Sequence, residues 1–150
     1  MKKILIHVLF VAVVVGLGAL IGIANIPGEW YQALNKPPFN PPNWIFGPVW
    51  TTLYVLIGIA GARTWLDSPS SSRMQIWFGQ MVLNFLWSPA FFGMESTVLG
   101  LIVIIPMLVL IVLFIQRSWN KDRISALLFL PYIAWVSFAT LLNLSLFILN

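Results

Sequence analysis

The side chains of this chain that could do chemistry are aromatic and neutral polar rather than charged. Three helical faces carry them, with Gln80, Asn84, Trp87 and Phe91 on one, Tyr132, Trp135, Ala139 and Asn143 on another, and Trp50 and Tyr54 on a third. Neutral polar groups in hydrocarbon prefer the interior of a helical bundle, so we expect the three faces to converge. A cavity between them would be apolar, flat-walled and sparsely polar, which suits a large planar hydrophobic ligand bound by stacking.

The same residues also fit a purely structural role. Asn84 and Asn143 could hydrogen-bond across helices to hold the bundle together. Tryptophans near helix ends commonly anchor a protein at the membrane interface, and four are interpreted in this way: Trp44, Trp65, Trp77 and Trp119. Gly18 and Gly22 form a G-x-x-x-G pair that indicates close helix packing, within the bundle or in a dimer. A ligand cavity and a simply packed bundle both remain open here.

Conventional catalytic and metal-binding groups are scarce. The chain has no cysteine and a single histidine, His7, which excludes a thiolate or multi-histidine metal site. His7 is interpreted as an interfacial side chain rather than a haem ligand. All four acidic residues fall in loops or just outside a helix end: Glu29, Asp67, Glu95 and Asp122. With no ionisable group at mid-depth, metal catalysis and ion-coupled transport are disfavoured, and no acid–base or nucleophile constellation is present.

The composition points to lipid as the solvent. Of 150 residues, 60% are hydrophobic and 8% are charged, whereas soluble domains carry about 25% charged residues. The net charge of +4 comes from basic residues dispersed at the ends of apolar runs. That dispersion is typical of topology signals and not of a nucleic-acid-binding face.

Five apolar segments are long enough to cross the membrane as helices, at residues 4–24, 44–66, 74–93, 97–116 and 124–149. The first is longer than the apolar core of a signal peptide and is interpreted as a retained helix. Helices are required because backbone polar groups must be satisfied within each segment in lipid. The sequence therefore predicts one domain, residues 1–150, that is an all-α integral membrane protein folded as a five-transmembrane-helix bundle.

The connections between the segments differ in kind. The short ones, at residues 67–72 and 94–96, predict that the helices they join are antiparallel neighbours. The longer loop, residues 25–43, is proline-rich and cannot be helical throughout. Within it Glu29–Leu34 could form one short helix, and its aromatic residues make the loop a candidate lid or pocket wall.

Basic residues set the expected orientation. Seven lie on one side of a five-span arrangement: Lys2, Lys3, Arg63, Arg73, Arg117, Lys121 and Arg123. Only Lys36 lies on the other side. The positive-inside rule then places the N-terminus in the cytoplasm, and the proline-rich loop and the C-terminus outside.

Several stretches resemble one known family, in order and in spacing. They read WY at 30–31, LNKPPFNPP at 34–42, WIFGPVWT at 44–51, LNFLWSP at 83–89, FFG at 91–93, PYIAW at 131–135 and FAT at 138–140, together with Tyr54, Gln80, Leu142 and Asn143. The chain is similar here to the TspO/MBR family of translocator proteins and tryptophan-rich sensory proteins. The resemblance spans nearly the whole chain.

The resemblance implies a five-helix bundle, commonly a homodimer, that binds porphyrins such as protoporphyrin IX without requiring a cofactor. Some members also bind sterols and synthetic isoquinoline or benzodiazepine-type ligands. On the matching positions, the pocket would be built by Trp30, Tyr31, Trp50, Tyr54, Asn84, Trp87, Ser88, Phe91, Trp135, Ala139 and Leu142. The sterol-recognition pattern is missing, because Leu144 and Ile148 stand where it needs tyrosine and arginine. We therefore expect a bacterial-type member of this family, located in the cell membrane.

Three functional hypotheses follow from the residues and the resemblance. The first is a receptor or sensor that binds tetrapyrroles in the bundle, linked to their transport or to stress signalling. The second is an enzyme that degrades porphyrin with light and oxygen, in which Trp87 and Trp135 would donate electrons to the excited pigment. The third is a structural membrane protein without a working ligand site.

Overall fold

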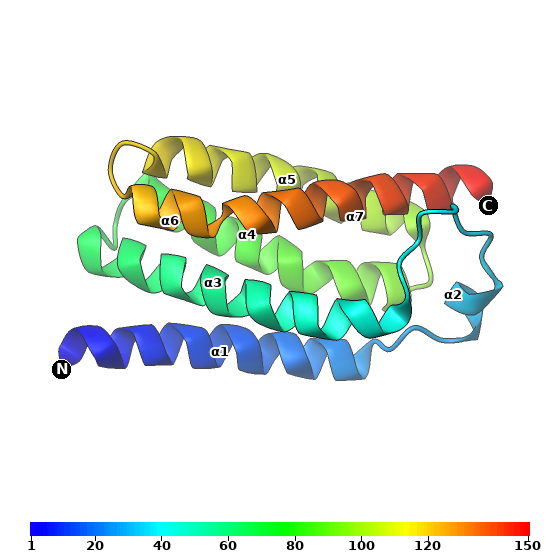
Figure 1. Cartoon of the computed structure of the whole chain (residues 1–150), viewed down its shortest axis with the longest axis horizontal. Coiled ribbons are helices and arrows are strands. Elements are labelled where there is room, and N and C mark those ends of the chain that lie inside the picture. Colours follow the sequence, from blue (N-terminus) through cyan, green and yellow to red (C-terminus); the bar gives the residue numbers. More distant parts are fainter.

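The computed structural model describes residues 1–150 and contains helices but no strands. Five long helices run lengthwise in the bundle, α1 (Lys2–Ala24), α3 (Phe46–Asp67), α4 (Ser72–Ser88), α5 (Thr97–Ser118) and α7 (Leu130–Leu149) (Figure 1). A short helix, α6 (Arg123–Leu128), leads into α7. A second short α-helix, α2 (Glu29–Ala33), lies at the opposite end of the bundle (Figure 1), and a 3-10 turn, Asn43–Ile45, precedes α3.

Four helical segments are long and apolar enough to cross a membrane, at Lys2–Ala24, Asn43–Asp67, Thr97–Ser118 and Arg123–Leu149. They match four of the five predicted spans closely. The remaining prediction, residues 74–93, is a 17-residue α-helix followed by a π-helical turn, Pro89–Gly93. Proline lacks the N–H that would continue the regular helical hydrogen bonding, which explains the change of helix type at this point.

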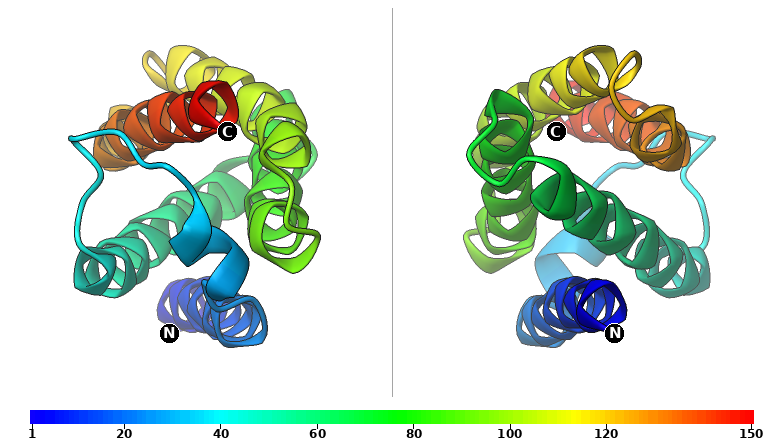
Figure 2. Two further views of the ribbon diagram at one scale, coloured as in Figure 1. Left: turned by 90° about the vertical axis from the view of Figure 1, so that its right-hand side faces the viewer. Right: turned by 90° about the vertical axis from the view of Figure 1, so that its left-hand side faces the viewer.

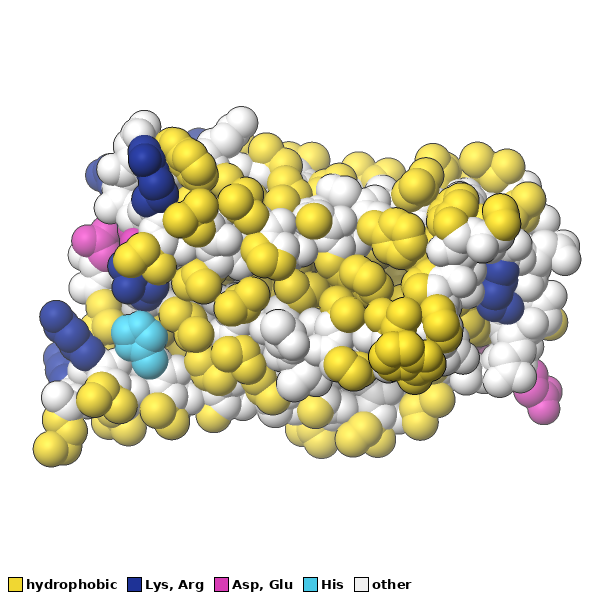
Figure 3. All heavy atoms as spheres, viewed as in Figure 1, with side chains coloured by type: hydrophobic (Ala, Val, Ile, Leu, Met, Phe, Trp, Pro, Cys, Tyr) yellow, Lys and Arg dark blue, Asp and Glu magenta, His cyan; other side chains and the backbone are white.

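The surface of the bundle has the pattern of a membrane protein. Apolar side chains cover its middle, and basic side chains gather at the end that holds the N-terminus (Figure 3). Lys36 lies at the other end, against α2. Large apolar residues such as Leu20, Ile102 and Ile105 are more than half exposed. In water this exposure would be costly, whereas in lipid it is the expected state.

The core lies between α3, α4, α5 and the α6–α7 segment. Its fully buried members include Ile57, Ile104, Phe114, Phe129 and Val136. The rings of Phe114 and Phe129 are 4.3 Å apart, which fixes the start of α7 against α5. This packed core fixes the positions of the helices relative to one another. The cavity described below lies beside it.

Small residues bring α1 close to α3. A Cβ atom on Gly58 of α3 would lie only 2.8 Å from the Cα of Val11, so only glycine allows this approach. Gly18 of α1 is buried and sits against the ring of Tyr54. One glycine of the G-x-x-x-G pair therefore serves packing within the bundle. The other, Gly22, has no neighbouring atom within 4 Å of where its Cβ would be.

The helices α3 and α4 are antiparallel neighbours, as their short connection predicts, but they pack less closely than α4 and α5. The short loop joins them, but the two helices separate beyond it, whereas α4 and α5 stay together along their length (Figure 2). The side chain of Trp77 fills the space between them and donates a hydrogen bond from Nε1 to the carbonyl of Ile57 (3.0 Å). Gly61 leaves room for the indole. The interpretation of Trp77 as an interfacial anchor is therefore wrong, because it is only 2% exposed.

The other three predicted anchors, Trp44, Trp65 and Trp119, are exposed on the surface. Their exposed fractions are 73%, 41% and 39%. Each lies at or near the end of a long helix, which is where interfacial tryptophans are found. Trp77 differs from them because a glycine on a neighbouring helix offers it a slot.

Ion pairs tie the helices together at the basic end. Arg63 of α3 donates two hydrogen bonds to Asp122 before α6, at 2.9 and 3.1 Å, and Ser125 donates a third. Burial disfavours the charged carboxylate, but these hydrogen bonds and the nearby charge of Arg63 outweigh it and lower the pKa of Asp122. Arg73 pairs with Asp67 in the same region.

The proline-rich loop closes the opposite end of the bundle. The predicted short helix is confirmed as α2, and Lys36 caps it by donating from Nζ to the carbonyl of Tyr31 (2.8 Å). The side chain of Asn150, at the end of α7, pairs with the backbone of Asn35 through two hydrogen bonds of 2.9 and 3.0 Å. The loop is thus fastened to the last helix.

Candidate functional site: an aromatic cavity beneath the loop

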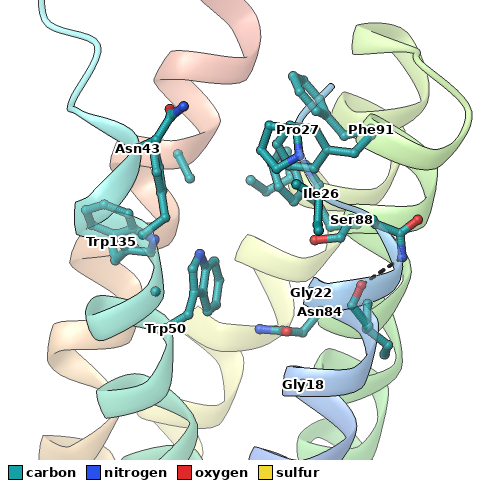
Figure 4. Close-up of a pocket in the computed structure, with 18 of the residues that line it drawn as sticks. Gly18, Gly22, Ile26, Pro27, Asn43, Trp50, Asn84, Ser88, Phe91 and Trp135 are labelled. Carbon is teal, nitrogen blue, oxygen red and sulfur yellow. Dashed lines mark hydrogen bonds between the residues drawn. The ribbon is translucent and has the colours of Figure 1, made fainter. Parts of the chain in front are cut away.

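A cavity of about 630 Å³ opens inside the bundle below the proline-rich loop. Its volume lies within the range of about 300–1,000 Å³ that is usual for small-molecule sites. Two walls face each other across it, with α3 and α7 on one side and α1 and α4 on the other (Figure 4). Tyr31 from α2 covers it at the loop end, where burial raises the pKa of the tyrosine hydroxyl and keeps it neutral.

A chain of hydrogen bonds joins the three predicted faces beside the cavity. Asn84 of α4 accepts a hydrogen bond from the Tyr54 hydroxyl of α3 (3.1 Å). It donates from Nδ2 to the Tyr132 hydroxyl of α7 (2.7 Å), which in turn donates to Oε1 of Gln80 (2.7 Å). The expected convergence of the three faces is therefore confirmed, and the polar groups are the contacts that produce it.

A second polar contact supports the α4 wall nearer the loop. The indole of Trp87 donates from Nε1 to Oδ1 of Asn143 (3.1 Å), and Asn143 donates to the carbonyl of Thr97 (2.9 Å). A side chain at Gly100 would collide with Asn143, so this glycine makes the contact possible. The ring of Phe91 stacks on Trp87 with centroids 4.8 Å apart and 19° between the planes. These contacts hold two aromatic rings rigidly at the edge of the cavity.

The opposite wall carries two neighbouring indoles, those of Trp50 and Trp135. The Nε1–H of Trp135 is buried and has no hydrogen-bond partner. The indole of Trp50 lies beside it, and its nitrogen points into the space between the two walls (Figure 4). A buried donor without an acceptor costs about 1–3 kcal/mol. The indole nitrogen of Trp50, rather than that of Trp135, is therefore the donor placed to meet a ligand acceptor. The hydroxyl of Ser88 faces the same space from α4 (Figure 4).

No group of three or more histidine, cysteine, aspartate or glutamate side chains forms a possible metal site in the chain. The polar groups that line the cavity are amides, hydroxyls and indoles. What the cavity offers chemically is therefore ring stacking and neutral hydrogen bonding.

The family model described as "TspO/MBR family" matches residues 8–149 of this chain. The chain belongs to the TspO/MBR family. It is 43% identical over 123 residues to the tryptophan-rich protein TspO of Archaeoglobus fulgidus, which covers 81% of this chain and 80% of that protein. It is 36% identical over 154 residues to the protein of the same name from Chlorobaculum tepidum, with 96% and 98% covered. Human translocator protein is 31% identical over 135 residues, with 85% and 80% covered.

Membership of the TspO/MBR family agrees with the four helices of spanning length, and the chain is a membrane protein. Ten of the eleven predicted site residues line this same cavity of the TspO/MBR protein: Tyr31, Trp50, Tyr54, Asn84, Trp87, Ser88, Phe91, Trp135, Ala139 and Leu142. The exception is Trp30, whose ring packs against the edge of Phe91 with centroids 5.5 Å apart. Trp30 therefore supports the cavity wall without lining it.

The sequence interpretation missed the α1 side of the cavity. Ala19, Gly22 and Ile26 line it together with Gly18, the glycine that packs against the tyrosine of α3. The only signal in the sequence was the G-x-x-x-G pair, which indicated helix contact and not a binding surface. Because Gly22 has no side chain and no close neighbour, it leaves space that a ligand could fill.

Proposed function

We propose that this TspO/MBR protein is a membrane receptor or sensor that binds a tetrapyrrole, such as protoporphyrin IX, or another planar hydrophobic ligand in its central cavity. The observation that carries the proposal is the cavity of about 630 Å³, walled by aromatic rings and shared by α1, α3, α4 and α7. A relative that is 36% identical over 135 residues is named "Tryptophan-rich sensory protein", from Cereibacter sphaeroides.

The chemistry of the cavity suits this ligand class. A flat conjugated macrocycle gains from stacking between aromatic walls. The indole N–H of Trp50, which points into the space between the walls, would donate to a carboxylate or carbonyl of the ligand (Figure 4). Binding at such a site would serve either to transport the ligand or to signal stress.

The proposed topology has five crossings of a bacterial cell membrane by one domain. Residues 72–93, which combine α4 and the π-helical turn, would cover about 30 Å at roughly 1.5 Å per residue. The basic end of the bundle then lies in the cytoplasm and the loop end outside. A homodimer within the bilayer is the proposed assembly.

Titration of the purified protein with protoporphyrin IX in darkness, followed by tryptophan quenching, tests the proposal. Ala139 lines the cavity, and Ala139→Leu puts a larger side chain into it. The affinity for protoporphyrin IX, read from the saturable quenching, should therefore fall by tenfold or more. Ala134→Leu is the matched control, because Ala134 is exposed on the outer side of the same helix. Absence of saturable quenching in the unaltered protein would favour a structural protein without a working site.

The second candidate function is oxidative degradation of porphyrin that depends on light and dioxygen. Two indoles at the cavity favour it: Trp135, whose N–H is free, and Trp87, which is held by stacking and a hydrogen bond. Either ring could donate an electron to an excited pigment, with dioxygen as the final oxidant. Illumination should then bleach the bound pigment, and Trp87→Phe or Trp135→Phe should stop the bleaching while binding persists. Unchanged bleaching in both variants would remove this role.

A further inference from the structure

A second concavity lies on the outside of the bundle, between α1 and α4. It has a volume of about 320 Å³, and every residue that lines it is apolar: Leu9, Phe10, Val13, Val14 and Leu17 from α1, and Trp77, Phe78, Met81, Val82 and Phe85 from α4. The glycines of α1 that line the central cavity, Gly18 and Gly22, are not among them. The groove is therefore a site distinct from the proposed tetrapyrrole cavity.

The groove is a slot between two helices that start at the same end of the bundle. The rings of Phe10 and Trp77 meet in it with centroids 5.4 Å apart. Its walls stay open, since Val13 is 50% exposed and Val82 is 57% exposed. The α1 side from Leu9 to Leu17 extends for about 12 Å along the helix axis. A narrow apolar slot of this shape suits a flexible hydrocarbon chain.

Basic residues continue the line of the groove towards the membrane surface. Lys2 and Lys3 each stand seven residues, or two helical turns, before Leu9 and Phe10, so they share a face with the groove about 10 Å away. Both lysines are exposed, and neither takes part in the two ion pairs of the protein. Gln75 of α4 is also exposed and stands seven residues before Val82, on the other wall. The lysine charges are therefore free to meet an anion.

We propose that the α1–α4 groove binds an anionic phospholipid, with one acyl chain in the slot and the head-group phosphate at Lys2 and Lys3. The apolar slot matches the chain, and the unpaired lysines match the charge of the head group. The concave shape favours a lipid chain over a second copy of the protein, because a second copy would need a convex ridge to fill the slot. This inference does not depend on the function of the central cavity.

Native mass spectrometry of the detergent-purified full chain tests the proposal. The protein is mixed with equal amounts of dioleoyl phosphatidylglycerol and dioleoyl phosphatidylcholine, and the retained lipids are counted. One phosphatidylglycerol should be retained in preference to phosphatidylcholine. Lys2→Gln with Lys3→Gln should reduce the preference by about fivefold for each lysine. The control, Lys121→Gln with Arg123→Gln, makes the same charge change at the turn that leads into α6 and should keep the preference.

A second set of variants tests the slot itself. Val13→Trp, or Val82→Trp from the other wall, should block the groove and remove the retained lipid, whereas Ile102→Trp on an exposed face of α5 should not. Equal retention of the two lipids by the unaltered protein would overturn the head-group assignment. Equal lipid retention in the groove variants and in Ile102→Trp would show that the acyl chain does not bind in the slot. Loss of dimers in Val13→Trp with unchanged lipid retention would assign the groove to a second copy instead.

Discussion

The Tyr132 hydroxyl is the centre of the polar chain that joins α3, α4 and α7, and its removal is the sharpest test of how the bundle is held. Tyr132→Phe deletes one bond that the hydroxyl accepts from Asn84 and one that it donates to Gln80. Tyr132 and Gln80 are 0% exposed, so water cannot replace the lost partner. The substitution leaves the size of the side chain almost unchanged, so the effect reports the hydrogen bonds and not a cavity.

The magnitude follows from the number of bonds lost. Hydrogen bonds between membrane helices average about 0.6 kcal/mol, and an orphaned buried group can cost about 1–3 kcal/mol. With two bonds lost, Tyr132→Phe should lower the free energy of unfolding by about 1–3 kcal/mol. Tyr54→Phe, which loses only the bond to Asn84, should cost about 0.6 kcal/mol.

Thermal unfolding in detergent, followed by circular dichroism, measures both variants. A loss of 1 kcal/mol should lower the midpoint by about 2–4 °C in a chain of this size. In the double variant Tyr132→Phe with Gln80→Met, the orphaned oxygen of Gln80 is gone, so the combined cost should be smaller than the sum of the single costs. Simple additivity, or equal losses in Tyr132→Phe and Tyr54→Phe, would refute this account of the polar chain.

Three further predictions concern packing, charge and the loop. Gly18→Ala should destabilise the protein by about 1–3 kcal/mol because its Cβ would overlap a tyrosine ring of α3, whereas Gly22→Ala should be nearly neutral in the same unfolding assay. The lowered pKa of Asp122 means that its pairing with Arg63 stabilises the fold above about pH 4 and is lost as the pH falls through the lowered value. Asp122→Asn should remove that part of the acid sensitivity, about 1 kcal/mol or less, and an unchanged pH profile would contradict the pairing. Asn150→Ala should speed amide hydrogen exchange across the proline-rich loop severalfold while leaving α3 unaffected; equal exchange would show that the side chain does not fasten the loop.

Most helix positions followed from the sequence, because long apolar runs in lipid have few alternatives to a helix. The predicted segments 4–24 and 97–116 differ from α1 and α5 by only two residues at an end. The α4 segment was harder, since the π-helical turn from Pro89 depends on a local change in hydrogen bonding that apolar content does not report. That interruption is why α4 ends at Ser88, five residues before the end of the predicted span.

The site was predictable where polar groups mark it. Asn84 and Tyr132 are conspicuous in apolar helices, and their need for partners fixes which faces must meet. The α1 wall could not be predicted in this way, because it has no polar side chain that needs a partner, and Gly22 contributes only empty space. The place of Trp77 depends on the slot that Gly61 leaves on another helix, and such a contact is visible only once the helices are packed.

The most direct test of the central claim is the nuclear magnetic resonance spectrum of the indole N–H groups of the eight tryptophans as protoporphyrin IX is added in darkness. The ligand should shift the signals of Trp50 and Trp135, whose indoles lie at the cavity. The signal of Trp77 should stay in place, because its N–H is already bonded in the packed core. Shifts confined to the exposed tryptophans Trp44 and Trp119, with no change at Trp50 and Trp135, would contradict binding in the central cavity.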